Sequence, residues 1–144
     1  MELLRAGQLG RADDQIWSKV RIAFADALGL EEDEVELGHR IIDELEAESL
    51  DFLDIAYKLE VSFDIKIPRG GIENTAKDGM EEGGYEINGV LTEGALVRLT
   101  EAMPEIPSEK FSAGLRVSEV PELFIVATFY NLVIRLLDEK NTAD

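Results

Sequence analysis

The sequence predicts an all-α fold, a four-helix-type bundle with an inserted glycine-rich segment and one extra helix. Three observations support this prediction. Apolar residues recur with helical spacing in three stretches, residues 16–28, 49–63 and 123–137. Glycines are concentrated between the second and third stretches, in residues 69–91. A further helical stripe follows them, in residues 92–103, and gives the extra helix.

Composition narrows the classes of function. The 144 residues suffice for one domain with a core, and 45% of them are hydrophobic. The 31 acidic residues exceed the 14 basic ones and give a net charge of −17. This acidity argues against nucleic-acid binding, which depends on cationic contacts to phosphates. It favours basic protein partners drawn in by electrostatic steering, although acidity could also serve solubility alone.

Two further absences in the sequence limit the chemistry. The chain has no cysteine, so it forms no disulfide, thiolate metal site or cysteine nucleophile. No apolar run is long enough to cross a membrane, and no charged-then-apolar leader opens the chain. We therefore expect a cytoplasmic protein without stable membrane insertion.

The first helix should begin at Asp13 or Asp14, either of which can cap it, and end at Gly29. Residues 1–12 are interpreted as a loose arm. Trp17 should lie partly buried beside the apolar stripe of the helix, which consists of Ile16, Val20, Ile22, Ala23, Phe24, Ala27 and Leu28.

A long acidic loop, residues 31–48, should follow the first helix. Five apolar anchors would let it pack on a bundle, namely Val35, Leu37, Ile41, Ile42 and Leu45. The only histidine, His39, is expected at the surface or packed within this loop. No Ser-His-Asp signature accompanies it, so no catalytic residue is predicted.

The central helix is expected to start at Ser49, a favourable N-cap residue, in a segment closed by Pro68. A capping box is not expected, because Phe52 occupies the third position after Ser49. An ordinary core stripe contains Phe52, Ile55, Ala56, Leu59 and Phe63. A second stripe lies opposite, with Leu50, Leu53, Tyr57 and Val61 flanked by Asp54, Lys58 and Glu60. One apolar face is enough to join a core, so the second stripe needs another role.

Turn residues dominate the next part of the chain. The alternation Tyr85-Glu86-Ile87 before Asn88-Gly89 predicts a small hairpin. The helix of residues 92–103 should bury Ala95, Leu96, Leu99 and Ala102, and Pro104 and Pro107 should end it. After a short turn at residues 117–120, Pro121 suits the first position of the last helix. That helix, residues 123–137, is apolar almost all round and should be buried on most sides.

The sequence resembles the free-standing bacterial acyl carrier proteins. The resemblance is carried by Glu48-Ser49-Leu50-Asp51, the amphipathic helix after it and the ending Phe63-x-Ile65-x-Ile67-Pro68. It covers residues 13–68 and, more loosely, 115–138. The family motif is usually Asp-Ser-Leu, and its serine carries 4′-phosphopantetheine through a phosphodiester. This chain departs from the family pattern at Glu46, where a glycine is usual, and at Glu48, where an aspartate is usual.

The resemblance implies a single carrier domain over residues 1–144. Within it, residues 1–12 form the arm, 13–69 the first two helices and their loop, 70–115 an insertion, and 116–138 a short turn and the last helix. An ordinary free-standing carrier is much shorter. The insertion could protect or extend the acyl site, or it could fold over the second stripe.

The resemblance also implies the site. Ser49 would hold covalent 4′-phosphopantetheine, so the chain would carry acyl groups rather than act as an enzyme. The expected partners are a phosphopantetheinyl transferase and acyl-processing synthases or acyltransferases with basic surfaces. Partner-binding residues would be Leu50, Leu53, Asp54, Tyr57, Glu60 and Val61. The residues lining the acyl chain would be Phe52, Ile55, Leu59 and Phe129. No metal site is predicted, because the acids after Asp78 fail the calcium-loop pattern.

The pathway is less defined than the site. The stretch from Ser49 to Tyr57 is similar to specialised carriers that serve long-chain acyl transfer to lipid A, and fatty acid or lipid synthesis is expected. Two alternatives stay open. One is a stand-alone carrier for polyketide or nonribosomal peptide synthesis, and the other is an unmodified helical adaptor.

Overall fold

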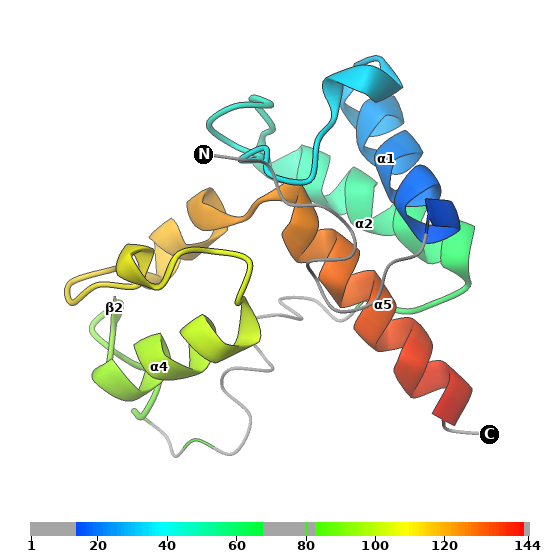
Figure 1. Ribbon diagram of the computed structural model, residues 1–144. Coiled ribbons are helices and arrows are strands. Elements are labelled where there is room, and N and C mark those ends of the chain that lie inside the picture. The colour runs from blue at the N-terminus through cyan, green and yellow to red at the C-terminus, as the bar shows by residue number, and fades with distance from the viewer. Residues whose placement is uncertain (1–13, 68–79, 81–82, 143–144) are drawn as a thin grey trace. The chain divides into compact units, whose positions relative to one another are not determined.

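The computed structural model describes residues 14–67, 80 and 83–142, which form two compact units (Figure 1). The first unit comprises Met1–Ile67 and Ile125–Asp144, and the second comprises Pro68–Phe124. The first contains α1 (Asp14–Leu28), the 3-10 turn η2 (Glu32–Glu34), α2 (Ser49–Phe63) and α5 (Val126–Thr142). The second contains β1 (Glu86–Ile87), β2 (Val90–Leu91), α4 (Glu93–Ala102) and the 3-10 segments η3 (Ser108–Lys110) and η4 (Val117–Leu123). The described residues are mostly helical, which confirms the all-α prediction of a carrier-like bundle with added elements.

Helices α1, α2 and α5 contact one another pairwise and enclose the core of the first unit (Figure 1). The predicted core stripes of α1 and α2 are confirmed at Val20, Phe24, Ile55 and Leu59, which have no exposed surface. The last helix is buried on most sides, as predicted, at Val126, Ala127, Thr128, Phe129, Tyr130, Leu132, Val133 and Ile134. The prediction was wrong for Ile22, which is 46% exposed. At about 100° per residue, Ile22 lies about 200° from Val20 and so faces away from the core.

The loop between α1 and α2 is held to the bundle by apolar and polar contacts. Val35, Leu37 and Ile41 are buried, which confirms three of the predicted anchors, and Ile42 and Leu45 are half-buried. Gly29 ends α1 in the left-handed conformation predicted for it, with φ of 70°. From there the chain turns into the acidic residues of η2.

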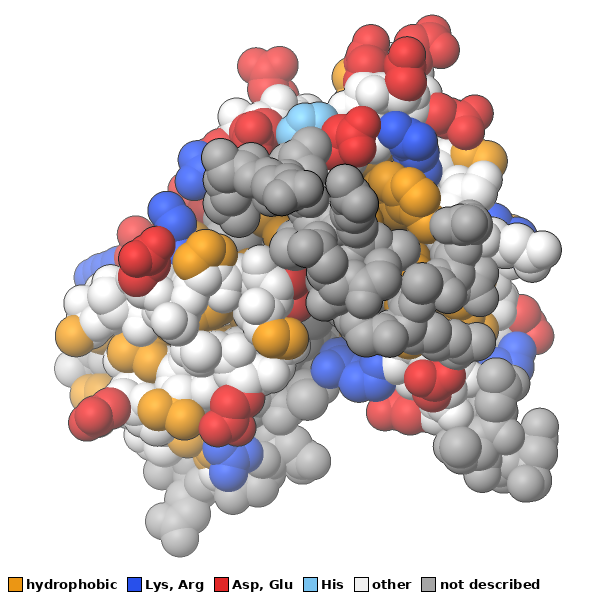
Figure 2. Space-filling model, in the orientation of Figure 1, with side chains coloured by type: hydrophobic (Ala, Val, Ile, Leu, Met, Phe, Trp, Pro, Cys, Tyr) orange, Lys and Arg blue, Asp and Glu red, His pale blue; other side chains and the backbone are white. Residues whose placement is uncertain are grey.

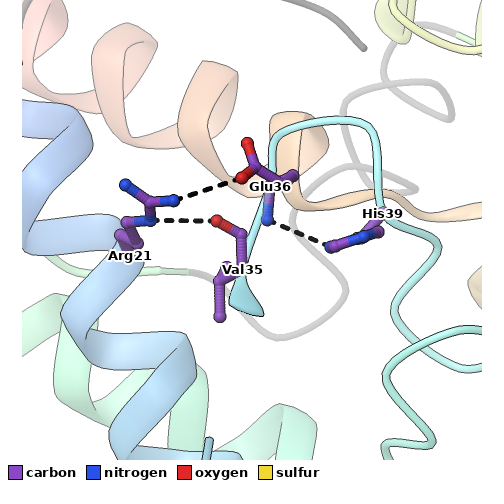
Figure 3. A network of polar contacts seen from close by, with 4 residues as sticks. All are labelled: Arg21, Val35, Glu36 and His39. Atoms are coloured by element: carbon purple, nitrogen blue, oxygen red, sulfur yellow. Dashed lines mark hydrogen bonds and ion pairs between the residues drawn. The ribbon is translucent and has the colours of Figure 1, made fainter. Parts of the chain in front are cut away.

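A polar network joins α1 to this loop (Figure 3). Arg21 donates from Nε to the carbonyl oxygen of Val35 at 2.9 Å and from Nη2 to Oε1 of Glu36 at 3.3 Å. The Glu36 amide donates to Nδ1 of His39 at 3.1 Å. His39 is therefore half-buried and bonded within the loop, as predicted. Trp17 is half-buried, also as predicted, and its ring meets that of Tyr130 edge-on with the ring centroids 6.1 Å apart.

The last helix begins later than predicted. Pro121 lies inside η4, and α5 starts at Val126 and continues to Thr142. The first two amides of α5 explain this start, because Val126 donates to the carbonyl of His39 at 3.0 Å and Ala127 to that of Leu37 at 2.9 Å. Ile125 pairs with Arg40 in an isolated antiparallel bridge. Tertiary contacts with the loop thus outweigh the local signal of the proline.

The first element described in the second unit is the predicted hairpin. Its register pairs Glu86 with Leu91 and Ile87 with Val90. Asn88 and Gly89 both have positive φ, 53° and 83°, as a two-residue hairpin turn requires. Helix α4 is capped by Thr92, whose Oγ1 accepts the Ala95 amide at 3.1 Å, and it buries Ala95, Leu96 and Leu99. The prediction of a helix in residues 92–103 is confirmed, but Ala102, which was predicted to be buried, is half-buried.

The second unit extends past residue 115, the predicted end of the insertion. The Leu91 amide donates to the carbonyl of Leu115 at 2.9 Å, and the Val117 amide donates to that of Gly89 at 3.0 Å. The short turn of η4 therefore belongs with the hairpin. The assignment of residues 1–144 to a single carrier domain stays a prediction. The predicted arm, the cap at Asp13, the turns of residues 69–79 and the acids after Asp78 lie outside or largely outside the described residues.

Candidate functional site

The N-cap of helix α2 lies one residue earlier in the chain than the sequence suggested. Ser49 is the first helical residue, and the N-cap is Glu48, which has an extended backbone (φ −107°, ψ 172°). The Glu48 amide donates to Oδ2 of Asp51 at 2.8 Å. The prediction of Ser49 as N-cap, without a capping box, was therefore wrong, because Asp51 lies three residues after the true N-cap and supplies the returning carboxylate.

The backbone at the start of α2 determines the electrostatic surroundings of Ser49. The first amides of an α-helix have no partner within the helix, and together with the helix dipole they favour an anion at that end. Ser49 begins the helix where these amides lie. The side chain of Ser49 lies outside the described part of the structure, so the predicted exposure of its hydroxyl stays a prediction.

The turn before α2 contains a strained residue. Glu46 has φ of 59°, in the left-handed region that favours glycine. Its neighbour Ala47 is buried, and the Ala47 amide donates to the carbonyl of Ile41 at 3.1 Å. Glu46 occupies the position at which the family that this sequence resembles usually has glycine. The chain therefore keeps a glycine-like turn at this position without a glycine.

The second apolar stripe of α2 is exposed. Its residues are Leu50, Leu53, Tyr57 and Val61, with exposed fractions of 76%, 56%, 64% and 65%. Asp54 is also exposed and lies at the edge of this stripe. We call these five residues the α2 outer face. The structure thus brings together five of the six predicted partner-binding residues on one accessible side.

The sixth residue, Glu60, has a structural contact. It is half-buried, and its Oε2 accepts the amide of Ile67 at 2.8 Å. Lys58 pairs with Asp26 of α1 at 2.9 Å and with Asp54 at 3.6 Å. The carboxylate of Asp26, which accepts a hydrogen bond from the Lys58 ammonium, raises the pKa of Lys58. These contacts tie the edges of α2 to α1 and to the chain that follows it.

The inner side of α2 meets aromatic rings from two other helices. The Phe52 ring lies 6.0 Å from that of Phe129, tilted by 35°. Phe129 also meets Phe24 of α1 edge-on at 5.7 Å. Ile55 and Leu59 lie deeper on the same side and have no exposed surface. All four residues predicted to line the acyl chain thus face the interior of the first unit.

Sequence reasoning placed Phe24 in the core but missed its contact with this group. Its helical spacing gave the burial. The partner ring comes from α5, more than a hundred residues away along the chain. Spacing within one helix carries no signal for such a contact.

Acidic side chains are numerous on the face of the molecule that Figure 2 shows. Four consecutive exposed acids follow α1, namely Glu31, Glu32, Asp33 and Glu34. In the part of the chain that the structure describes, no group of three histidine, cysteine, aspartate or glutamate residues is placed to hold a metal ion. No helix formed by the described residues is both long and apolar enough to cross a membrane.

The chain is similar to several curated acyl carrier proteins. That of Borrelia garinii subsp. bavariensis is 41% identical over 66 residues, which cover 46% of this chain and 78% of the relative. That of Akkermansia muciniphila is 39% identical over 57 residues, 40% of this chain and 71% of the relative. That of Clostridium acetobutylicum is 34% identical over 64 residues, 44% of this chain and 83% of the relative. No protein-family model and no solved structure matches the chain. The identity and coverage of these relatives show that the chain belongs to the acyl carrier protein family.

Proposed function

We propose that this chain carries acyl groups as thioesters on a 4′-phosphopantetheine arm attached to Ser49. The observation that carries the proposal is the tetrad Glu48-Ser49-Leu50-Asp51 at the first turn of α2, in a chain whose relatives are acyl carrier proteins. The chain has no cysteine, so the arm would supply the only thiol. The chain's own residues position the arm and its cargo and catalyse no bond-making step.

The first turn of α2 suits a phosphodiester in one respect and opposes it in another. The helix dipole and the first-turn amides favour an anion there. The carboxylates of Glu48 and Asp51 repel one, although that of Asp51 is already engaged by the Glu48 amide. An attaching enzyme must therefore bring cationic groups or a metal ion to offset the acids.

The α2 outer face is the proposed docking site for enzymes. Its exposed leucines, tyrosine and valine offer apolar contact, and Asp54 with the acids of the first turn offers negative charge. The complementary partners are a phosphopantetheinyl transferase and acyl-processing synthases or acyltransferases that present basic residues around an apolar patch. Glu60 would act at the edge of this face, because its carboxylate already bonds to Ile67.

The acyl chain is proposed to lie against the inner side of α2 and the facing side of α5. Phe52, Ile55, Leu59 and Phe129 are the apolar side chains that line this region. Burying a hydrocarbon chain there would remove it from water and hold the thioester close to the protein.

The proposed pathway is fatty acid or lipid synthesis, with acyl transfer to lipid A as its narrower form. A carrier for polyketide or nonribosomal peptide synthesis would use the same arm and differ only in the cargo. An unmodified helical adaptor would keep the α2 outer face and lack the arm. The mass of the protein purified from its native host separates this adaptor from both carriers.

Modification of Ser49 tests the proposal directly. Incubation with coenzyme A and a broad-specificity phosphopantetheinyl transferase should add one phosphopantetheine per chain, measured by intact mass. Ser49→Ala should abolish the gain, and Ser62→Ala, which removes a serine near the other end of α2, should leave it unchanged. A wild-type chain that stays unmodified, or a modified Ser49→Ala chain, would overturn the proposal.

A further inference from the structure

The turn formed by residues 36–39, in the loop after α1, supplies hydrogen-bond acceptors to the start of α5. The Val126 amide donates to the carbonyl of His39 at 3.0 Å, and the Ala127 amide donates to that of Leu37 at 2.9 Å. The first amides of a helix have no partner within the helix itself. The position of this turn therefore determines whether the first two amides of α5 are satisfied.

His39 closes the turn with two hydrogen bonds to a single residue. Its amide donates to the carbonyl of Glu36 at 3.2 Å, and its Nδ1 accepts the Glu36 amide at 3.1 Å (Figure 3). A ring nitrogen of histidine accepts a hydrogen bond only while it carries no proton. The second bond therefore requires a neutral imidazole whose proton is on Nε2.

We propose that protonation of His39 is a switch that opens this turn and releases the start of α5. The imidazolium carries hydrogens on both nitrogens, so Nδ1 and the Glu36 amide become two donors that face each other. The ring must then turn away, and the Glu36 amide loses its acceptor. The carbonyls of Leu37 and His39 move with the turn, so their hydrogen bonds to α5 weaken. This inference goes beyond the proposed function, because it concerns the fold and needs no group on Ser49.

The residues around the turn leave the His39 ring as the group that responds near neutral pH. Histidine is the side chain that ordinarily changes charge between about pH 5 and 8, and the chain has one histidine and no cysteine. The charged side chains around the turn come from α1, η2 and the loop, namely Arg21, Glu36, Arg40, Asp43 and Glu44, with the three acids of η2. Helix α5 has no charged residue before Arg135. Carboxylates ordinarily titrate near pH ~4 and arginine above pH ~12, both outside that range.

Three of these carboxylates already have partners. Glu36 pairs with Arg21 of α1, and Asp43 pairs with Arg40. The Glu44 carboxylate accepts the Arg40 amide at 2.8 Å. These bonds persist when the imidazole gains a proton, so the bond from the Glu36 amide to Nδ1 is the one in this turn that protonation removes.

The test follows the full-length chain by NMR between about pH 8 and about pH 5.5. The ring protons of His39 give the midpoint of its own titration, and the amide signals of Glu36, Val126 and Ala127 should shift with that midpoint. Protection of the two α5 amides against hydrogen exchange, corrected for the intrinsic effect of pH, should fall about fivefold as the ring is protonated. The Ala95 amide is an internal control, because its acceptor is the Thr92 hydroxyl, which does not titrate in this range. Its protection should stay constant.

Two substitutions at His39 separate the hydrogen bond from the charge. His39→Gln keeps an acceptor that cannot be protonated, so Val126 and Ala127 should be as well protected at low pH as at high pH. His39→Ala removes the acceptor and should give low protection at both. A fall in His39→Gln as large as in the wild type would overturn the switch, because another group would then be responsible.

The wild type alone tests the switch if a variant fails to fold. Constant protection of Val126 and Ala127 while His39 takes up its proton would overturn it. A proton on Nδ1 at high pH, identified from the ring nitrogen signals, would also overturn it, because that ring could not accept the Glu36 amide. An equal fall at Ala95 would contradict it as well, since the whole chain would then be loosening.

Discussion

Helices α2 and α4 start from similar apolar patterns and differ in how closely they follow the usual rules. Helix α4 has a threonine cap, one buried stripe and a single large apolar side chain on its exposed side, Val97. Helix α2 has a glutamate at the N-cap, a glycine-like turn formed by Glu46 before it, and a second stripe left exposed. Departures from local rules tend to gather at functional sites. The comparison therefore favours α2 over α4 as the helix that holds the proposed site.

The largest expected effect is a difference in stability between substitutions on the inner and outer sides of α2. Leu59→Ala should lower the free energy of unfolding by about 2–5 kcal/mol, because it empties a fully buried site. Leu53→Ala should change it by no more than about 0.5 kcal/mol, because that side chain is exposed. Urea unfolding measures both. A large loss in Leu53→Ala would mean that another part of the chain covers the α2 outer face.

The next prediction concerns association with the transferase. Asp54→Lys should slow modification of Ser49 by about tenfold at low ionic strength, because charge reversal at the edge of a docking site acts on the association rate. The matched change on α4, Glu93→Lys, also reverses an exposed acid in a first or second turn and should have little effect. Modification rates at low and high salt check this. Equal slowing by both variants would point to net charge rather than to α2.

The caps of the two helices give a smaller contrast. Thr92→Ala should lower the free energy of unfolding by about 1 kcal/mol, because it removes the oxygen that accepts the Ala95 amide. Ser49→Ala should lower it by no more than about 0.5 kcal/mol, since Ser49 lies after the N-cap and not at it. Comparable losses in thermal or urea unfolding would restore Ser49 to a capping role.

A glycine in the turn before α2 should make the protein more stable. Glu46→Gly should raise the free energy of unfolding by up to about 1 kcal/mol, because relief of the left-handed strain exceeds the added flexibility of the unfolded chain. Asp64→Gly is a useful counterpart at the other end of α2. Asp64 also has positive φ, but its side chain pairs with Lys140 at 2.9 Å, so its loss should offset the relief. Destabilisation by Glu46→Gly would show that the Glu46 side chain has a role of its own.

The smallest expected effect concerns Lys58. Asp26 raises the pKa of Lys58, so the pair stabilises the fold at pH values below the ordinary lysine pKa and loses that contribution as pH rises through the raised value. Asp26→Asn should lower the pKa of Lys58, followed by NMR titration of its side chain. An unchanged pKa would show that Asp54 alone governs this lysine.

Local signals were enough to predict much of the fold. Gly29 and the Asn88-Gly89 turn act through their own backbone preferences, and the structure places both as expected. The start of α5 was mispredicted because it depends on hydrogen bonds to the carbonyls of Leu37 and His39. Residue spacing does not predict hydrogen bonds to such distant parts of the chain. Tertiary contacts of this kind lie outside what a local pattern can encode.

In the candidate site, too, local patterns could be predicted and tertiary contacts could not. The second apolar stripe of α2 could be predicted, because it is visible in the residue spacing. Its exposure could not, because the spacing does not show whether the insertion folds over it. The N-cap at Glu48 was missed because serine is the stronger capping residue by type, while the deciding contact is the Asp51 carboxylate. The ring of Phe24 joined the site only through the fold, since its contact with Phe129 connects the first and last helices.

The most direct measurement is the mass of the protein purified from its native host, with fragmentation to locate any modification. The carrier account predicts an added phosphopantetheine, alone or with an acyl group, on the peptide that contains Ser49 and on no other serine. The acyl mass would also identify the cargo. An unmodified chain from growing cells, or a modification at a different serine, would contradict the account.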